Sequence, residues 1–505
     1  MKKTIILILI LLVSLCNGIN KYVCHPDGND LNGGGFLLTS ETVTWSSWHS
    51  SFAPVKIQAG CTISDNGGGK CRLTSIGNLS SLYKDILVYC DFSATYTDDR
   101  YMIIAADANY IDIDLAFDVN VPTADVRIGG AVKSPKLACT LGNTTTGEEV
   151  LFPCNQTTQT INEVDGTANA INMSVENATL NIYGVDEATG IAITSEDSND
   201  WPVIQAKTES TWTDNTGMFT STAALCYSKV DKILFDGNNI VPRVIFLDND
   251  NTDYCILQWG RVEIKSSKSD GYGCLINGYT ELNSFSIANA DYGIKKLKID
   301  DCHIAFFPVS RQTCPISELW LDGNHYGIYS GTSIIAINQI RTVILSNHTI
   351  AAIRVNRYDS YIRCCMTFIN NAIDLKVDAY STINYIHNFY NSVFWNSSPT
   401  GKILEVDNDT YVDVGFYNCV FGDVNDASDM SRFSGITPTR IDCEYIQADP
   451  FMDSANGDYR LNPAFPDLSK IYDWTKQVNN IGATSVAEPV SNGSGNGGSI
   501  MVTED

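Results

Sequence analysis

Three carboxylates in the second half of the chain could carry acid–base chemistry. Asp300 and Asp301 are adjacent, and Asp270 precedes them in the run Ser269–Gly271. Two carboxylates on either side of a glycosidic bond can act as general acid and general base in an inverting hydrolysis. A polysaccharide-degrading enzyme, either a glycoside hydrolase or a polysaccharide lyase, is therefore one hypothesis for this sequence.

Aromatic side chains form a second group of candidates, because sugars stack on flat rings that have one apolar face. We expect Tyr326 and Tyr329 on one lateral face of the fold, and Trp395 beside a projecting loop at 397–402. Packing in the core is the alternative role for such rings. If the rings are exposed, the partner they favour is a polysaccharide or a glycoprotein.

Metal chemistry has less support, and we expect no cofactor. Calcium is the alternative, since carboxylate oxygens are its preferred ligands, but neither acidic run has the Gly or the closing Glu of an EF-hand loop. No paired Cys-x-x-Cys pattern suggests zinc, and no Gly-x-Ser-x-Gly or phosphate-binding loop occurs. The two acidic runs are Asp248, Asp250 and Asp253, and Asp407, Asp409 and Asp413.

The elements that position these residues form an internal repeat. From about residue 295 a phrase recurs in which two apolar residues alternate with another residue, and Asn or Asp follows shortly after. Its apolar anchors are separated by 22, 24, 23, 21 and 27 residues. Such a period indicates stacked supersecondary units. The anchors are Ile299, Leu321, Leu345, Phe368, Phe389 and Phe416.

The units are predicted to be strands, because the apolar positions alternate with period two and Val, Ile, Phe and Tyr dominate. Coils of roughly 23 residues without a helix predict an all-β parallel solenoid, with like side chains stacked about 4.8 Å apart. Each phrase ends in a residue that tolerates a left-handed turn, so we expect a hydrogen-bonded turn ladder. This ladder would explain Asp301 without catalysis. Its predicted members are Asp301, Asn324, Asn347, Asn370, Asn391 and Asn418.

The remaining composition divides the chain. Residues 19–135 predict a small β-rich domain that caps the first coil, and 136–225 predict irregular early coils. The solenoid is expected over 226–465. Residues 466–505 form a Gly/Ser/Asn-rich tail with the composition of a flexible linker.

The first residues predict export. Residues 1–18 combine two lysines, an apolar stretch too short to span a bilayer, and small residues before a cleavage site after Gly18. Lipidation of Cys16 is the alternative. The sixteen cysteines fit an oxidising compartment, and the close pairs Cys61/Cys71 and Cys302/Cys314 are the predicted disulfides. We therefore expect a secreted or cell-surface protein without a transmembrane anchor.

Composition sets further limits. The 505 residues include 33 Lys and Arg against 58 Asp and Glu, a formal net charge of −25. This balance argues against a nucleic-acid partner, because phosphate binding requires a basic surface. The hydrophobic content of 44% is sufficient for a core.

Four segments resemble the secreted and phage-encoded right-handed parallel β-helix proteins of the pectate-lyase-like superfold. The resemblance implies that fold with a terminal cap, but no activity, because most members of the group have no assigned function. It rests on four stretches: the opening Lys21–Phe36, then Ile128–Pro135, Ile233–Asn238 and the closing Ala448–Leu461.

A second resemblance concerns activity. Asp300 and Asp301 are similar to the paired aspartates of polygalacturonase-like glycosidases, which would imply a catalytic His325 and a substrate-binding Arg354. The expected Gly-His-Gly is interrupted on both sides of His325, and the expected Lys is Asn356. These departures make a non-enzymatic role our first expectation.

We therefore predict an exported, non-enzymatic β-helix at a cell or virion surface that mediates adhesion or glycan binding. The polysaccharide-degrading enzyme is the first alternative. An oligomeric phage spike or fibre is the second, in which the solenoid would associate with copies of itself.

Overall fold

The computed structural model describes most of the chain between residues 19 and 461. The predicted signal segment and tail lie outside the described residues. The chain forms two compact units, residues 1–165, 170–207 and 226–234 in the first, and residues 166–169, 208–225 and 235–505 in the second. The described ranges are 19–37, 40, 43–75, 77–93, 96–118, 123–155, 158–166, 171–173, 175, 178–195, 197–213, 216–221, 226–249, 255–278, 293–308, 316–330, 340–355, 361–378, 385–396, 400–407, 412–454 and 458–461.

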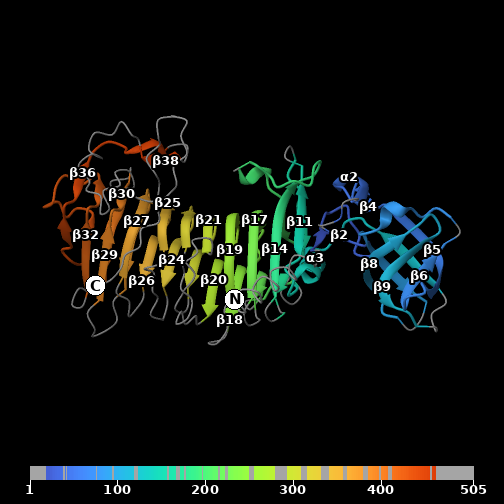
Figure 1. The fold of residues 1–505 in the computed structure, drawn as a ribbon. Coiled ribbons are helices and arrows are strands. Elements are labelled where there is room, and N and C mark those ends of the chain that lie inside the picture. Colours follow the sequence, from blue (N-terminus) through green and yellow to red (C-terminus); the bar gives the residue numbers. More distant parts are fainter. Residues whose placement is uncertain are drawn as a thin grey trace, which may run out of the picture. The chain divides into compact units, whose positions relative to one another are not determined.

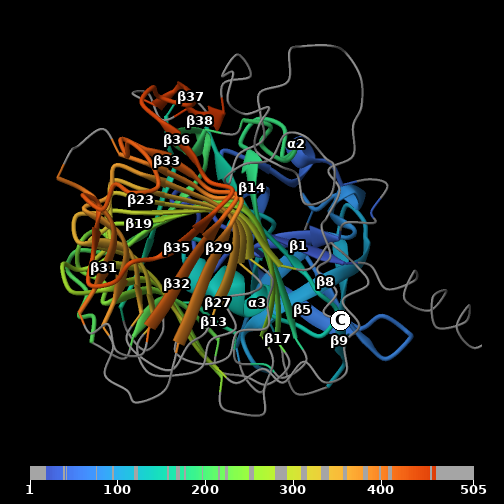
Figure 2. The ribbon, with the colours of Figure 1, turned by 90° about the vertical axis from the view of Figure 1, so that its left-hand side faces the viewer.

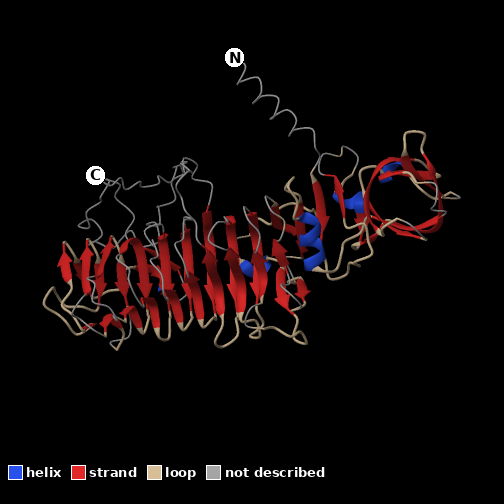
Figure 3. Cartoon of the chain, turned by 90° about the horizontal axis from the view of Figure 1, so that it is seen from below, coloured by secondary structure: helices blue, strands red, loops and turns tan. Residues whose placement is uncertain are grey.

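The first unit contains a closed antiparallel barrel (Figures 1 and 3). Side chains alternate between the inside and the outside of the barrel along its strands. In β9, for example, Ile111 and Ile113 point into the core and are fully buried. Three cysteines, Cys61, Cys71 and Cys90, lie in the same core. The barrel strands are β5 (Lys56–Asp65), β6 (Lys70–Thr74), β7 (Leu87–Phe92), β8 (Asp99–Ala106), β9 (Tyr110–Ala116) and β10 (Thr123–Ile128).

The rest of the first unit is built mainly from parallel strands, with α3 (Pro135–Gly142) beside them. The α3 helix begins where Ser134 Oγ accepts a hydrogen bond from the Leu137 amide and Pro135 follows in the first turn. The strands are β1 (Asn20–Val23), β2 (Gly35–Leu37), β11 (Glu149–Cys154), β12 (Ile161–Val164), β13 (Ile171–Met173), β14 (Thr179–Asp186), β15 (Val203–Ala206) and β17 (Cys226–Asp236); short elements are α2 (Trp45–Trp48), β3 (His49–Ser50), β4 (Ala53–Pro54), η1 (Ser81–Tyr83) and η2 (Ser198–Asp200).

The second unit is a parallel β-helix in which successive coils place their strands side by side (Figures 1 and 2). Its first sheet contains β19 (Cys255–Lys265), β21 (Gly293–Asp300), β23 (Ile316–Asp322), β25 (Ile340–Ser346), β27 (Tyr361–Ile369), β29 (Tyr385–Tyr390), β30 (Val393–Trp395), β32 (Val412–Tyr417), β33 (Val420–Gly422), β35 (Thr439–Ile441) and β36 (Glu444–Ile446). Its second sheet contains β16 (Gly217–Ser221), β18 (Arg243–Asn249), β20 (Tyr272–Gly278), β22 (Ile304–Pro308), β24 (Tyr326–Ser330), β26 (Ala351–Val355), β28 (Ile373–Val377), β31 (Lys402–Val406) and β34 (Phe433–Ser434).

The register confirms that the central anchors stack. Leu321 pairs with Leu345, and Leu345 pairs with Phe368, in consecutive parallel strands. The prediction that Phe389 is the next anchor after Phe368 is wrong. Phe368 pairs with Phe394 and not with Phe389. The cause is an additional turn at Asn391, which divides this stretch into β29 and β30. Both pieces pair with β27, and all three phenylalanines remain buried in one stack.

The turn ladder is present but divides in two. The backbone amide of Asn347 donates to the Ile369 carbonyl, and that of Asn370 donates to the Trp395 carbonyl, which continues the first ladder to the end of β30. The second ladder begins at Asn391, which donates to Tyr417. Left-handed φ angles of about 50° to 63° mark the ladder turns, whose residues are Asp301, Gly323, Asn347, Asn370, Asn391, Asn418 and Asp442.

The predicted ladder position at Asn324 is wrong by one residue. Gly323 has the left-handed φ of 63°, and Asn324 follows it as a fully buried residue. The Asn324 Oδ1 accepts the amide of Cys302 at 2.8 Å, and Asn371 accepts the amide of His348 at 3.0 Å in the same way. The residue after each left-handed position therefore forms an inner stack that satisfies buried turn amides.

Candidate functional site

Half-buried aromatic rings form a continuous row over the second sheet, and we call this row the aromatic face. Tyr272 lies 5.2 Å from Phe307, which stacks on Tyr329 at 5.4 Å, measured between ring centroids. Tyr326 lies 5.6 Å from Tyr329. Since neighbouring strands are about 4.8 Å apart, the row extends about 14 Å across the sheet, from Tyr272 on β20 to Arg354 on β26. Its members are Tyr272, His303, Phe307, Tyr326, Tyr329 and Arg354.

Arg354 on β26 holds one end of the aromatic face. Its Nη1 donates to the Tyr326 hydroxyl at 2.9 Å, and its guanidinium lies 5.3 Å from the Tyr326 ring and 5.1 Å from the Tyr329 ring. Its Nε donates to Asp378 at 2.6 Å. A guanidinium fixed by a carboxylate and two rings orients both tyrosines before any ligand arrives.

Asp378 is the buried anchor of this arrangement, with 2% of its side chain exposed. Burial raises the pKa of Asp378, Arg354 opposes this shift, and Asp407 adds to it. Lys376 lies 3.7 Å from Asp407 and 2.7 Å from Glu405, so the edge of the aromatic face carries charges of both signs.

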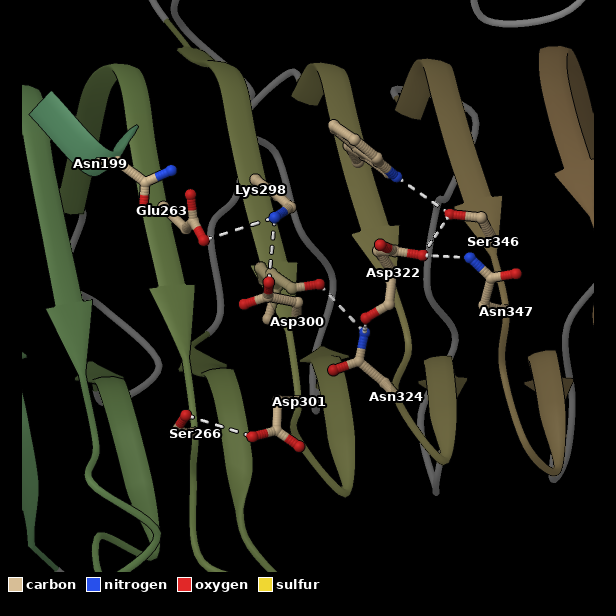
Figure 4. A network of polar contacts seen from close by, with 12 residues as sticks. Asn199, Glu263, Ser266, Lys298, Asp300, Asp301, Asp322, Asn324, Ser346 and Asn347 are labelled. Atoms are coloured by element: carbon tan, nitrogen blue, oxygen red, sulfur yellow. Dashed lines mark hydrogen bonds and ion pairs between the residues drawn. The ribbon is translucent and has the colours of Figure 1, made fainter. Parts of the chain in front are cut away.

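Figure 4 shows a second polar group, on the first sheet, which we call the acidic cluster: Glu263, Lys298, Asp300 and Asp322. Lys298 Nζ lies 2.9 Å from Asp300 and 3.4 Å from Glu263. Asp300 and Asp322 pair in register on β21 and β23. Burial raises the pKa of Asp300, whereas Asp322 accepts hydrogen bonds from Ser346 and Asn347.

The catalytic set predicted from the sequence does not converge. Asp300 belongs to the acidic cluster, but Asp301 turns away at the ladder and accepts a hydrogen bond from Ser266 Oγ at 3.2 Å (Figure 4). Asp270 is exposed and pairs with Lys268 at 3.2 Å. His325 is exposed, and its ring lies 5.1 Å from that of His303. Adjacent residues at a strand end diverge because one stays in the strand and the next enters the turn.

The two predicted sugar-binding tyrosines lie together on the aromatic face, but Trp395 does not join them. Trp395 is half-buried and packs, with Trp320 and Ile344, against an apolar strip on the outside of the first sheet. A Cβ placed on Gly422 would lie 2.1 Å from its ring, so the indole fits against a glycine. The strip consists of Ile369, Val393, Val420, Ile446 and Phe451.

Sequence reasoning missed His303, Phe307, Tyr272 and Asp378. The signal that could have found Phe307 and Tyr272 is spacing, because Phe307 precedes Tyr329 by one coil and Tyr272 is in register with Ile304 on β22. Asp378 follows Val377, one position beyond the register pair of Val355 and Val377, so its proximity to Arg354 depends on how the chain turns there.

Within the described ranges, no three His, Cys, Asp or Glu side chains gather in a way that could hold a metal ion. Asp250, Asp253 and Asp409 of the predicted calcium runs lie outside those ranges, as does Cys314. None of the helices that the structure describes has the length and apolar character needed to cross a membrane.

Comparisons with known proteins give only distant similarity. No family model matches the chain, and no curated protein matches it. Among solved structures, pectate lyase Pel9A is similar with a TM-score of 0.37 and 11% identity, over 70% of this chain and 92% of that one. The catalytic domain of a GH87 α-1,3-glucanase in complex with nigerose is similar with a TM-score of 0.29 and 8% identity, over 77% and 92%. Similarity at this level assigns no activity, and the fold rests on the strand register described above.

Proposed function

We propose that this protein binds glycans, as polysaccharide or glycoprotein, through the aromatic face, and that it does so outside the cytoplasm. The observation that carries the proposal is the row of rings from Tyr272 to Tyr326, each half-buried so that one surface reaches solvent. Rings held in one orientation lose little conformational freedom on binding, which favours affinity. The signal-like residues 1–18 support the location.

The chemistry at the two ends of the face suits a polyhydroxylated ligand. The apolar faces of the rings would stack on the C–H surface of sugars, while Arg354, His303 and the carboxyl of Asp407 supply donors and acceptors at the margin. A row of about 14 Å accommodates a short oligosaccharide. Adhesion would follow if many copies were displayed on one surface, because multivalency raises avidity.

A glycan array followed by calorimetry tests the proposal. The double variant Tyr326→Ala/Tyr329→Ala should lose tenfold or more in affinity, the equivalent of about 1.4 kcal/mol. The matched control is Tyr417→Ala, which truncates a half-buried tyrosine stacked on Tyr390 at 4.8 Å on the other sheet. Absence of binding to any glycan across pH 4 to 8, or equal losses in the control, would contradict the proposal.

Polysaccharide cleavage is the second candidate, and the acidic cluster favours it. Burial raises the pKa of Asp300, and Asp322 accepts hydrogen bonds from Ser346 and Asn347, so the two carboxyls differ in environment as a general acid and a base do. Release of reducing ends from a polysaccharide panel should then be abolished by Asp300→Asn. Asp301→Asn is the control, since Asn tolerates the left-handed turn. Inactivity on a broad panel would remove this candidate.

A role as an oligomeric spike remains the third hypothesis. It predicts that the full chain associates in solution, and mass measurement by light scattering distinguishes a trimer from a monomer. A monomer at micromolar concentration would contradict it without affecting glycan binding.

A further inference from the structure

Two cysteines occupy equivalent positions in consecutive coils at the second ladder. Tyr417 pairs with Ile441 and Val420 pairs with Glu444, both offset by 24 residues, so Cys419 lies in register with Cys443. The Glu444 amide donates to the Cys419 carbonyl at 2.9 Å, which holds the two turns together. Neighbouring parallel strands are about 4.8 Å apart, within the range of about 4.4 to 6.8 Å between the Cα atoms of a disulfide.

The two side chains also point the same way. Each thiol contacts the carbonyl two residues before it, Cys419 that of Tyr417 and Cys443 that of Ile441, both at 3.4 Å. Each also contacts a carbonyl of the preceding coil, at 3.5 Å for Phe389 and 3.4 Å for Phe416. Each thiol influences the pKa of the other, so the two side chains are neighbours. Both are free thiols in this structure.

We propose that Cys419 and Cys443 form a disulfide that staples the last two coils of the solenoid in the oxidised protein. The co-reactant is an oxidised disulfide, either of the glutathione class or in a protein disulfide oxidant. The Cys443 thiolate attacks the donor disulfide and releases one thiol. Cys419 then loses its proton and attacks the Cys443 sulfur, releasing the second thiol. The protein gives up two protons and two electrons, and the donor takes them up.

The environments of the two thiols set this order. Cys443 is partly exposed, and hydrogen bonding from Cys419 is the main cause that lowers the pKa of its thiol. Cys419 is fully buried, and burial raises the pKa of its thiol well above the usual value. Exposed thiolates meet an external oxidant first, so Cys443 forms the mixed disulfide and Cys419 resolves it.

The inner stack of the first ladder provides a matched control. Cys302 also follows a left-handed residue, Asp301, and contacts the carbonyl two positions before it at 3.2 Å. Its neighbours in the stack are Ser267 and Asn324, which cannot form a disulfide. Cys302 therefore has no thiol partner within its stack, and it should not become joined to Cys419 or Cys443 under conditions that oxidise that pair.

Peptide mapping of the full chain tests the proposal directly. After equilibration in a glutathione redox buffer, alkylation and non-reducing trypsin digestion, peptide 403–432 should be found joined to peptide 441–460. Each of these peptides contains one cysteine, Cys419 or Cys443, so the link is unambiguous. Peptide 299–311, with Cys302, should be joined to neither of these two peptides. Recovery of the first two peptides alkylated and separate, or joined to other partners, would overturn the proposal.

A stability measurement adds a second readout. Reductant should lower the melting temperature of the oxidised wild type by several degrees, because closing this loop restricts the unfolded chain. The variant Cys419→Ser/Cys443→Ser should show a clearly smaller reductant effect than the wild type. If that variant does not fold, Cys443→Ser replaces it, since only the partly exposed thiol is changed. A reductant effect of equal size in the variant would contradict the staple.

Discussion

A fully buried carboxyl makes the stability of the solenoid depend on pH. Asp374 is completely buried, and its Oδ1 accepts a hydrogen bond from Asn371 at 2.9 Å. Its Oδ2 has no hydrogen-bond partner among the described residues. Burial raises the pKa of Asp374 from 3.8 to about 7, against the opposing effects of Asn371 and Arg432. The folded protein therefore prefers the protonated acid over most of the range below neutrality.

The size and sign of the effect follow from linkage. In the unfolded chain this carboxyl titrates near 3.9, and each unit of difference is equivalent to about 1.4 kcal/mol. Because the folded-state pKa is raised, the contribution to stability is fully present below about pH 4 and is lost as pH rises through 7. Ionisation of Asp374 thus costs about 4 kcal/mol of unfolding free energy at neutral pH and above.

The variant Asp374→Asn isolates this effect. It keeps the oxygen that accepts from Asn371 and has no charge, but its amide brings buried N–H donors that cost about 1 to 3 kcal/mol. We expect it to gain about 1 to 3 kcal/mol over the wild type at pH 8 and no advantage at pH 4. Urea denaturation from pH 4 to 8 measures both, with Asp413→Asn, an exposed carboxylate on β32, as control. Parallel pH profiles for Asp374→Asn and wild type would refute the reasoning.

Three further perturbations test other parts of the fold. Burial lowers the pKa of His348 to about 4, so the unfolding free energy should fall by about 3 kcal/mol as pH falls from about 6.5 to 4. In urea denaturation, His348→Gln should reduce this loss at acidic pH, and an unchanged loss would contradict the prediction. Asn418 has a φ of 51°, so Asn418→Ala should cost about 1 to 2 kcal/mol and Asn418→Gly clearly less; equal losses in thermal unfolding would argue against a strained turn. Phe394 is 1% exposed and its ring lies 4.6 Å from that of Phe368, so Phe394→Ala should cost about 3 to 5 kcal/mol in urea denaturation, whereas a cost below 1 kcal/mol would show that the stack is not well packed.

The stacked core could be predicted from sequence because its signal is local. Inward positions must be apolar in every coil, so Leu321, Leu345 and Phe368 repeat at one spacing and reveal the register. The additional turn at Asn391 could not be found this way. It repeats the usual phrase of alternating apolar residues followed by Asn, and β30, the strand that continues the register with β27, is likewise followed by an Asn, Asn396. Two turns with the same residue type are indistinguishable until the strands are paired.

The site was predictable only where neighbours in sequence remain neighbours in space. Tyr326 and Tyr329 are three residues apart on one strand, and their proximity followed from that. Arg354 and Asp378 meet across coils of the second sheet, 24 residues apart in the sequence, and this pair could not be recognised until the strands were paired. The closed barrel was expected only as β-rich sequence, since closure depends on which edge strands pair, as β10 does with both β5 and β7.

The apolar strip outside the first sheet has a consequence for the integrity of the chain. Phe451 begins β37 (Phe451–Asp453), which pairs with β38 (Asp458–Leu461), and its ring covers the strip that includes Val393 and Ile446. Proteolytic cleavage just before Phe451 would release β37 and β38 and would expose the rest of the apolar strip along several strands. Such nicked molecules should adhere to one another and to apolar chromatography resins, while intact molecules from the same preparation should not.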